Sequence, residues 1–144
     1  MEINLHYQPL VGRFTSLTAG VLFTYLSITI IGYGAAVAIP ENLLLPLMQF
    51  SPTFALSLTE FFTIGIPLAV SFYLLALIFR WLVKMVYSYL LVAPFILFML
   101  YGLVTIGYNN ENIWYYFSLT VAKLLPILAC AIFLAKQDAS NNET

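Results

Sequence analysis

The sequence is poor in ionisable side chains. Its five Lys or Arg and six Asp or Glu make up 8% of the 144 residues, whereas 62% are hydrophobic and the mean hydropathy is +0.97. Ordinary soluble domains carry about 25% charged and about 45–50% apolar residues. A soluble domain of this size cannot bury so much apolar surface, so we expect a lipid bilayer around most of the chain. The five basic residues are too few for the phosphate contacts of a nucleic-acid partner.

Residues that commonly carry catalysis or bind metals are also scarce. Cys130 is the only cysteine, which excludes an internal disulfide and a cysteine-based metal site. His6 is the only histidine, and it precedes the first apolar run. No histidine is therefore available inside the membrane for a haem, a two-His metal site or a Ser-His-Asp set. We therefore predict no catalytic residues, no metal and no cofactor, and hence no enzyme.

Four long apolar runs dominate the chain. They span about 14–39, 57–79, 85–107 and 113–135, and the second begins somewhere between 51 and 58. Each supplies the roughly 20 helical residues that cross a hydrocarbon core about 30 Å thick. The runs are continuous and not alternating, which excludes strands. The sequence thus predicts an all-α polytopic membrane protein, with a bundle of four transmembrane helices in one domain, 1–136, and a disordered polar tail at 137–144.

The charges outside these runs predict the orientation. Glu41 and Glu111 lie in two connections, and four spans place the basic residues together on the other side. By the positive-inside rule that side is cytoplasmic, so both the N and C termini are expected to be cytoplasmic. We expect the host to be a bacterial cytoplasmic (inner) membrane. The basic residues in question are Arg13, Arg80, Lys84 and Lys136.

The connection 41–56 is unusual because it is long, rich in leucine and interrupted by Pro46 and Pro52. Such a segment is typical either of an interfacial stretch that covers helix ends or of a short re-entrant turn. Both interpretations remain open on the sequence alone.

Lys123 lies near the middle of the fourth run, where a charged lysine costs about 2.5–3.5 kcal/mol. Such a residue usually faces the bundle interior or a wet cavity, and Glu60 is its candidate partner. If the second helix begins near Ser51, Glu60 lies about 12 Å and Lys123 about 15 Å from the outer end, at 1.5 Å per residue. If it begins at Ser57, Glu60 instead completes a capping box near the surface.

Three runs contain a central proline: Pro67, Pro94 and Pro126. Each removes the hydrogen bond to the carbonyl four residues earlier. Ordinary helix kinks are the simpler interpretation. The alternative is a cation or substrate site, because transporters build such sites from helices broken near the midplane.

Small residues recur at a spacing of four in the first run. Gly32 and Ala36, Gly34 and Ala38, and Ser16 and Gly20 form three such pairs. Small side chains let helix backbones approach closely in membranes. We predict a helix-packing face, directed either at other helices of this chain or at a partner protein or second copy, that consists of Gly20, Gly32, Gly34, Ala36 and Ala38.

These features favour a non-catalytic accessory, assembly or regulatory subunit of a larger membrane complex. Its partners would be the bilayer and either another protein or a second copy of the chain. One alternative is a small oligomeric transporter or channel, in which Glu60 and Lys123 face the pathway. Another is a bacterial immunity or exclusion protein that blocks a pore-forming toxin.

Overall fold

The computed structural model describes residues 8–37, 39–83, 86–108 and 112–141, and all regular structure within these ranges is helical. Four of its helical stretches are long and apolar enough to cross a membrane, which confirms the all-α prediction with four such helices. The elements in chain order are α1 (Gln8–Ala35), α2 (Glu41–Phe50), α3 (Pro52–Glu60), the π-helical turn η1 (Phe61–Gly65), α4 (Ile66–Val83), α5 (Ser88–Tyr108) and α6 (Ile113–Asn141).

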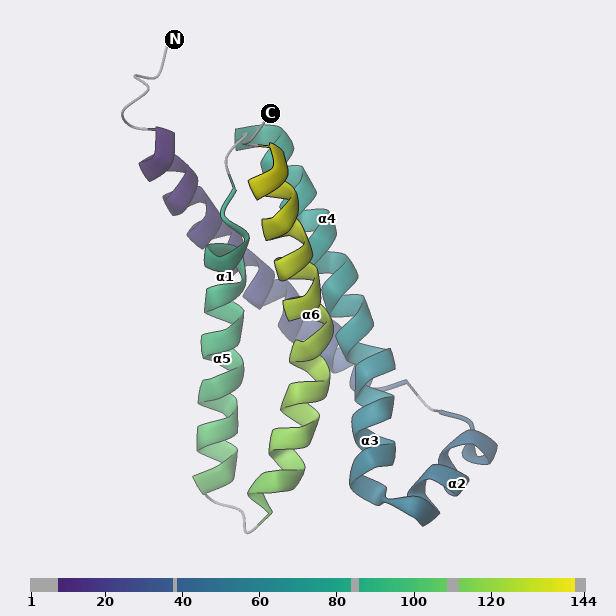
Figure 1. Ribbon diagram of the computed structural model, residues 1–144. Coiled ribbons are helices and arrows are strands. Elements are labelled where there is room, and N and C mark those ends of the chain that lie inside the picture. The colour runs from purple at the N-terminus through teal and green to yellow at the C-terminus, as the bar shows by residue number, and fades with distance from the viewer. Residues whose placement is uncertain (1–7, 38, 84–85, 109–111, 142–144) are drawn as a thin grey trace.

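The long helices form an inclined bundle. The elements α3, η1 and α4 form one rod beside α6, α5 lies on the other side of α6, and α1 crosses behind them at a steep angle (Figure 1). The start of α1 and the end of α6 lie at the same end of the bundle, which we call the terminal end. The start of α6, the start of α3 and all of α2 lie at the opposite end, the far end.

Several helix boundaries differ from those expected; α1, for example, spans Gln8–Ala35 instead of about 14–39. The second long helix begins at Pro52 and not near 57, because Ser51 caps it: the Ser51 side chain accepts the backbone N–H of Phe54 at 3.3 Å. Proline fits the first helical position, where its missing N–H has no helical partner anyway. At the other end of the chain, α6 continues to Asn141, so most of the expected tail 137–144 is helical. The connection 41–56 contains the ten-residue helix α2.

The core of the terminal half contains a cluster of three phenylalanines. Phe23 of α1, Phe72 of α4 and Phe95 of α5 are fully buried. The ring of Phe23 meets those of Phe72 and Phe95 edge-on, at centroid distances of 5.3 and 5.2 Å. Such pairs contribute about 0.5–1.5 kcal/mol beyond the area they bury. This phenylalanine cluster joins three of the four long helices.

Two glycines of α1 bring it close to its neighbours. A Cβ at Gly20 would lie 2.5 Å from the Leu91 carbonyl oxygen of α5, and one at Gly34 would lie 2.6 Å from the Thr63 carbonyl oxygen of η1. No real side chain fits at such distances. Close backbone approach through small residues is the usual way in which membrane helices pack.

The other small residues of α1 point elsewhere. Gly32 has open space where a Cβ would stand, and Ala36 is exposed. Ala38 lies outside the described residues. The expected packing face is therefore divided, with Gly20 and Gly34 inside the bundle and Gly32 and Ala36 on its surface.

Polar contacts tie the terminal end together. Arg80, near the end of α4, donates from Nη2 to the Leu134 carbonyl oxygen at 2.9 Å and to Asp138 Oδ2 at 2.7 Å, both on α6. Ser16 of α1 is buried and accepts the N–H of Tyr87, just before α5, at 2.9 Å. These contacts join distant parts of the chain where the helices end.

Candidate functional site

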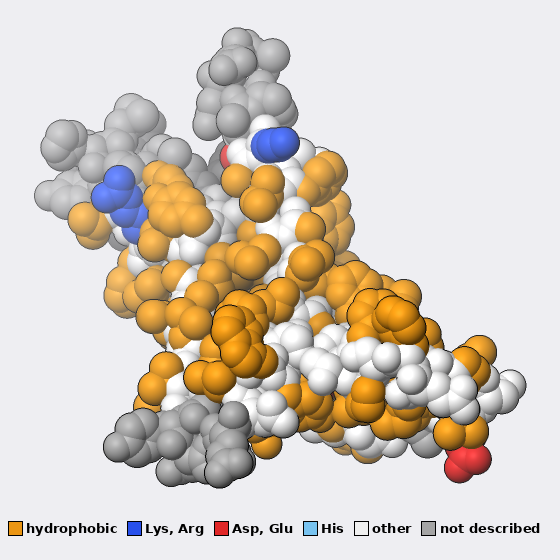
Figure 2. Space-filling model, turned by 60° about the horizontal axis from the view of Figure 1, so that its bottom comes forward, with side chains coloured by type: hydrophobic (Ala, Val, Ile, Leu, Met, Phe, Trp, Pro, Cys, Tyr) orange, Lys and Arg blue, Asp and Glu red, His pale blue; other side chains and the backbone are white. Residues whose placement is uncertain are grey.

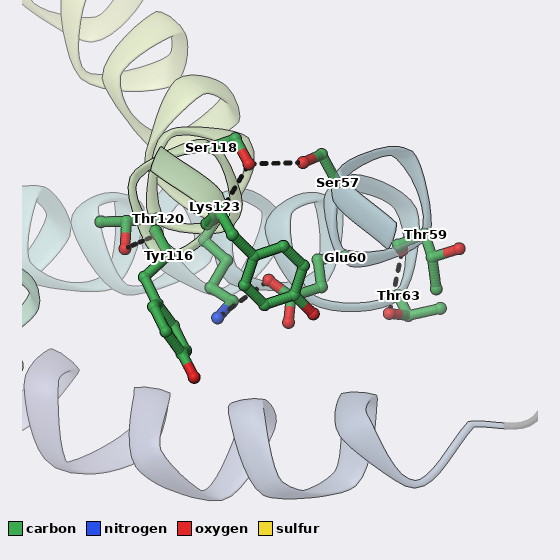
Figure 3. A network of polar contacts seen from close by, with 9 residues as sticks. Ser57, Thr59, Glu60, Thr63, Tyr116, Ser118, Thr120 and Lys123 are labelled. Atoms are coloured by element: carbon green, nitrogen blue, oxygen red, sulfur yellow. Dashed lines mark hydrogen bonds and ion pairs between the residues drawn. The ribbon is translucent and has the colours of Figure 1, made fainter. Parts of the chain in front are cut away.

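Glu60 and Lys123 meet inside the bundle. Glu60 is the last residue of α3, Lys123 lies near the middle of α6, and Glu60 Oε2 is 2.9 Å from Lys123 Nζ. The two side chains are 24% and 16% exposed. Figure 3 shows them leaving the seam between the two helices on the side that faces α1. The structure therefore brings together the two charges that the sequence singled out, and Ser57 does not cap the helix.

Contacts on either side of the pair set the register of the two helices. Toward the far end, the Ser57 hydroxyl donates to that of Ser118 at 3.2 Å (Figure 3). Toward the terminal end, a Cβ at Gly65 would lie 2.9 Å from the Ala122 carbonyl oxygen and 3.1 Å from Pro126 Cγ. A polar contact and a close backbone contact thus place the charged side chains at the same level.

The Glu60–Lys123 pair is neutral overall, but its hydrogen bonding is incomplete. Glu60 Oε2 is buried and makes no hydrogen bond of good geometry within the described residues. Its charge is compensated instead by the Lys123 ammonium, 2.9 Å away. Burying an ion costs several kcal/mol, and an opposite charge in contact offsets part of that cost. Removing either partner alone leaves the other uncompensated.

The π-helical turn η1 directly follows Glu60. The N–H of Ile66 donates to the Phe61 carbonyl oxygen, five residues earlier instead of four. Pro67 comes next and has no N–H for the Thr63 carbonyl, so the regular α pattern is interrupted here. Such turns frequently occur at functional sites. The sequence indicated an irregularity at Pro67, but not a π-helical turn.

A cavity of about 210 Å³ lies between α1, α5 and α6 in the far half of the bundle, with Lys123 in its wall. Its polar side chains all belong to α6 and share one face, at a spacing of four and then three residues. The Thr120 hydroxyl donates to the Tyr116 carbonyl oxygen at 2.8 Å. The lining residues are Ile31, Phe98, Met99, Gly102, Leu103, Ile106, Tyr116, Leu119, Thr120 and Lys123.

The cavity stops before the terminal half. Met99, in its wall, is nearly buried, and Phe95, one helical turn nearer the terminal end of α5, belongs to the fully buried phenylalanine cluster. The cavity that reaches Lys123 is thus closed by packed side chains on one side of the pair.

A second, wider groove of about 520 Å³ follows the seam between α3 and α6. It is lined by hydroxyl groups and apolar side chains, and two of the hydroxyls, Ser57 and Ser118, bond to each other. The lining residues are Ser51, Thr53, Phe54, Ser57, Phe117, Ser118, Val121 and Ala122.

None of the three prolines lines the cavity, and two of them lie where helices touch. Pro94 meets α1 at Gly20 and Pro126 meets η1 at Gly65, so two of the kink positions pack against glycines. Pro67 has no N–H to donate to the Thr63 carbonyl, and that carbonyl lies against Gly34. Within the described residues no group of three or more His, Cys, Asp or Glu side chains could hold a metal ion.

Several contacts were not anticipated from the sequence, among them the Ser57–Ser118 bond, the Arg80–Asp138 pair, and the places of Tyr116 and Thr120 in the cavity wall. For the tyrosine and threonine a signal existed, because both share a helical face with Lys123. For Asp138 there was none, because its polar surroundings are typical of a tail. No protein-family model, curated protein or solved structure matches the chain. Its function is therefore inferred from its own residues.

Proposed function

We propose that this protein spans a bacterial cytoplasmic (inner) membrane four times, with both termini in the cytosol, as a non-catalytic accessory, assembly or regulatory subunit. Figure 2 shows apolar side chains over most of the visible face, with Lys and Arg toward the terminal end. Arg13, Arg80 and Lys136 belong to that end, whereas Glu41 begins α2 at the far end. The positive-inside rule supports a cytosolic terminal end.

The observation that carries the accessory role is the uncovered apolar surface of α2. This helix projects from the bundle (Figure 1), and none of its residues is buried. Leu43, Leu45 and Phe50 are exposed, the last to 84%. A ten-residue helix has little stability by itself. Docking of its apolar side chains on another protein would stabilise both the helix and the complex.

The surface of α1 offers a second contact, near the end of that helix. Gly32 and Ala36 are exposed one helical turn apart, and nothing within this chain fills the space over Gly32. A helix of a partner or second copy can approach closely over such residues. Gly20 and Gly34, in contrast, are already used within the bundle.

Native mass spectrometry after mild-detergent purification tests this role. We expect a second protein at fixed stoichiometry with the natural chain and with the control Val104→Leu, which changes another exposed side chain at the far end. Gly32→Leu and Phe50→Gln should lose the partner without a lower melting temperature. A bare monomer of the natural chain, or a partner that both variants retain, would contradict the accessory role.

The cavity beside Lys123 favours a second candidate, a small oligomeric transporter or channel. The phenylalanine cluster closes the terminal half, so transport by this chain would require a rearrangement or a pathway between copies. Measurements of ion flux in proteoliposomes test the transporter or channel candidate. If Lys123→Leu folds but abolishes flux that the natural chain supports, transport is favoured, and if the natural chain carries no flux, this candidate fails.

A further inference from the structure

The cavity is partly open, since Phe98 and Ile106 in its wall are 38% and 44% exposed, and its size and lining indicate the kind of molecule that fits. At about 210 Å³ it is somewhat larger than the engineered apolar cavity of about 150 Å³ that admits benzene. Ile31, Leu103 and Leu119 are among its apolar walls, and its polar side chains are confined to the α6 wall. The fitting molecule has a compact apolar body of roughly benzene size and one polar end.

The polar end of that molecule must accept hydrogen bonds. The ammonium of Lys123 has three N–H donors, and Glu60 Oε2 is its one acidic neighbour within the described residues. Figure 3 shows the Tyr116 side chain on the same side of α6, with its hydroxyl directed toward α1. A phenolic hydroxyl can donate as well. Donors on one wall and hydrocarbon on the others match a carboxylate on an apolar body.

Charge balance restricts how a carboxylate enters. The Glu60–Lys123 pair has zero net charge, and apart from Lys123 the lining holds one titratable side chain, Tyr116, with none from α1 or α5 among the described residues. An anion that entered alone would leave a net charge of about −1 in an apolar space, which costs several kcal/mol. An anion that enters with a proton leaves the site neutral.

We propose that this cavity binds a small apolar monocarboxylate, of about the size of benzoate, together with one proton. The proton adds to the Glu60 carboxylate, and the Lys123 ammonium transfers its ion pair from Glu60 to the ligand. No covalent bond of the ligand breaks, and the net change is the uptake of one carboxylate and one proton. Both enter from the far half, because the phenylalanine cluster closes the other side. The site does not depend on the accessory role.

Calorimetric titration of benzoate into the full chain in detergent tests the proposal. Repeating it near pH 7 in buffers of different ionisation enthalpy gives the number of protons taken up, and protein-free micelles correct for partitioning. We expect saturable binding with uptake of about one proton per benzoate. Benzyl alcohol, of similar size but uncharged, should bind with no proton.

Substitutions at Glu60 and Lys123 distinguish the roles of the two charged groups in binding and in proton uptake. Glu60→Gln is already neutral, so it should bind benzoate at least as tightly as the natural chain but take up no proton. Lys123→Gln should weaken benzoate binding by about tenfold or more. Lys136→Gln, which changes an exposed lysine of the same helix, should leave affinity and proton uptake unchanged.

Three results would overturn the inference: no saturable benzoate binding by the natural chain, binding without proton uptake, or the same uptake in Glu60→Gln. If the single variants fail to fold, the doubly neutral Glu60→Gln/Lys123→Gln chain keeps the cavity without either charge. It should bind benzyl alcohol and not benzoate, and retained benzoate binding would refute the role of Lys123. None of these outcomes depends on whether a partner protein co-purifies.

Discussion

Alanine substitutions at Gly34 and Gly32 test whether α1 packs on η1 through backbone contact. The two glycines lie two residues apart in the same helix and differ in what faces them. An added methyl at Gly34 would lie 2.5 Å from Ile64 Cγ1 and 2.6 Å from the Thr63 carbonyl oxygen, whereas at Gly32 it would meet nothing within 4 Å. Comparing the two alanine variants therefore isolates the steric cost of the added methyl group.

The magnitude follows from two opposing effects. Replacing glycine by alanine in a helix stabilises by about 0.5–1 kcal/mol at either position. Overpacking costs about 1–3 kcal/mol, and at Gly34 part of the obstacle is backbone, which yields little. We expect Gly34→Ala to be less stable than Gly32→Ala by about 1–3 kcal/mol. At about 4 °C per kcal/mol for a chain of this size, its melting temperature should be about 4–12 °C lower.

The single cysteine provides the assay. Cys130 is partly buried and packs against the core, so a thiol-reactive fluorescent dye reports when heating exposes it. The melting curves of the two variants and the natural chain are compared in the same detergent. Equal melting temperatures for the variants, or a Gly34→Ala chain more stable than the natural one, would refute the proposed close contact.

Three further predictions concern the core, the terminal end and the topology. Phe23→Ala should lower the free energy of unfolding by about 2–3 kcal/mol in the same assay. This is less than in a soluble core, because the cost of the cavity remains in lipid whereas most of the cost of transfer from water does not apply. Asp138→Asn should cost only about 1 kcal/mol, since the Asp138 side chain is 39% exposed, but should raise amide exchange in the last turn of α6, because Arg80 loses its charged partner and keeps only the Leu134 carbonyl. Asn112→Cys in a Cys130→Ala background should react with an impermeant maleimide on intact cells, and reaction only after permeabilisation would reverse the proposed orientation.

The long helices could be predicted from the sequence because hydropathy over about 20 residues reflects a requirement of the whole segment. The start of the second helix could not. Ser51 followed by Pro52, and Ser57 followed by Glu60, are both valid capping patterns, and local residues do not decide between them. In the structure Ser51 caps the helix, and the Ser57 hydroxyl bonds instead to Ser118 on α6, a contact that the order of residues does not reveal.

The candidate site was only partly readable for the same reason. Matching depths of Glu60 and Lys123 could be derived from residue counts, since each residue of a helix rises about 1.5 Å. The opposite wall of the cavity comes from α1 and α5, and its position depends on how those helices cross. Crossing is set by close contacts such as that of Gly20 with Leu91. A small-residue spacing does not reveal which of its members face inward.

The π-helical turn after Glu60 affects the direction of everything before it. Each residue of an α-helix rotates the chain by about 100°, so one additional residue in a turn changes the angle between the segments on its two sides. If the same residues formed a regular α-helix without this turn, Glu60 would be rotated by about 100°, roughly a quarter of a circle, away from α6, and the hydropathy of the span would be unchanged. Hydropathy alone therefore does not reveal which feature of this span directs its one acidic residue, Glu60, toward Lys123.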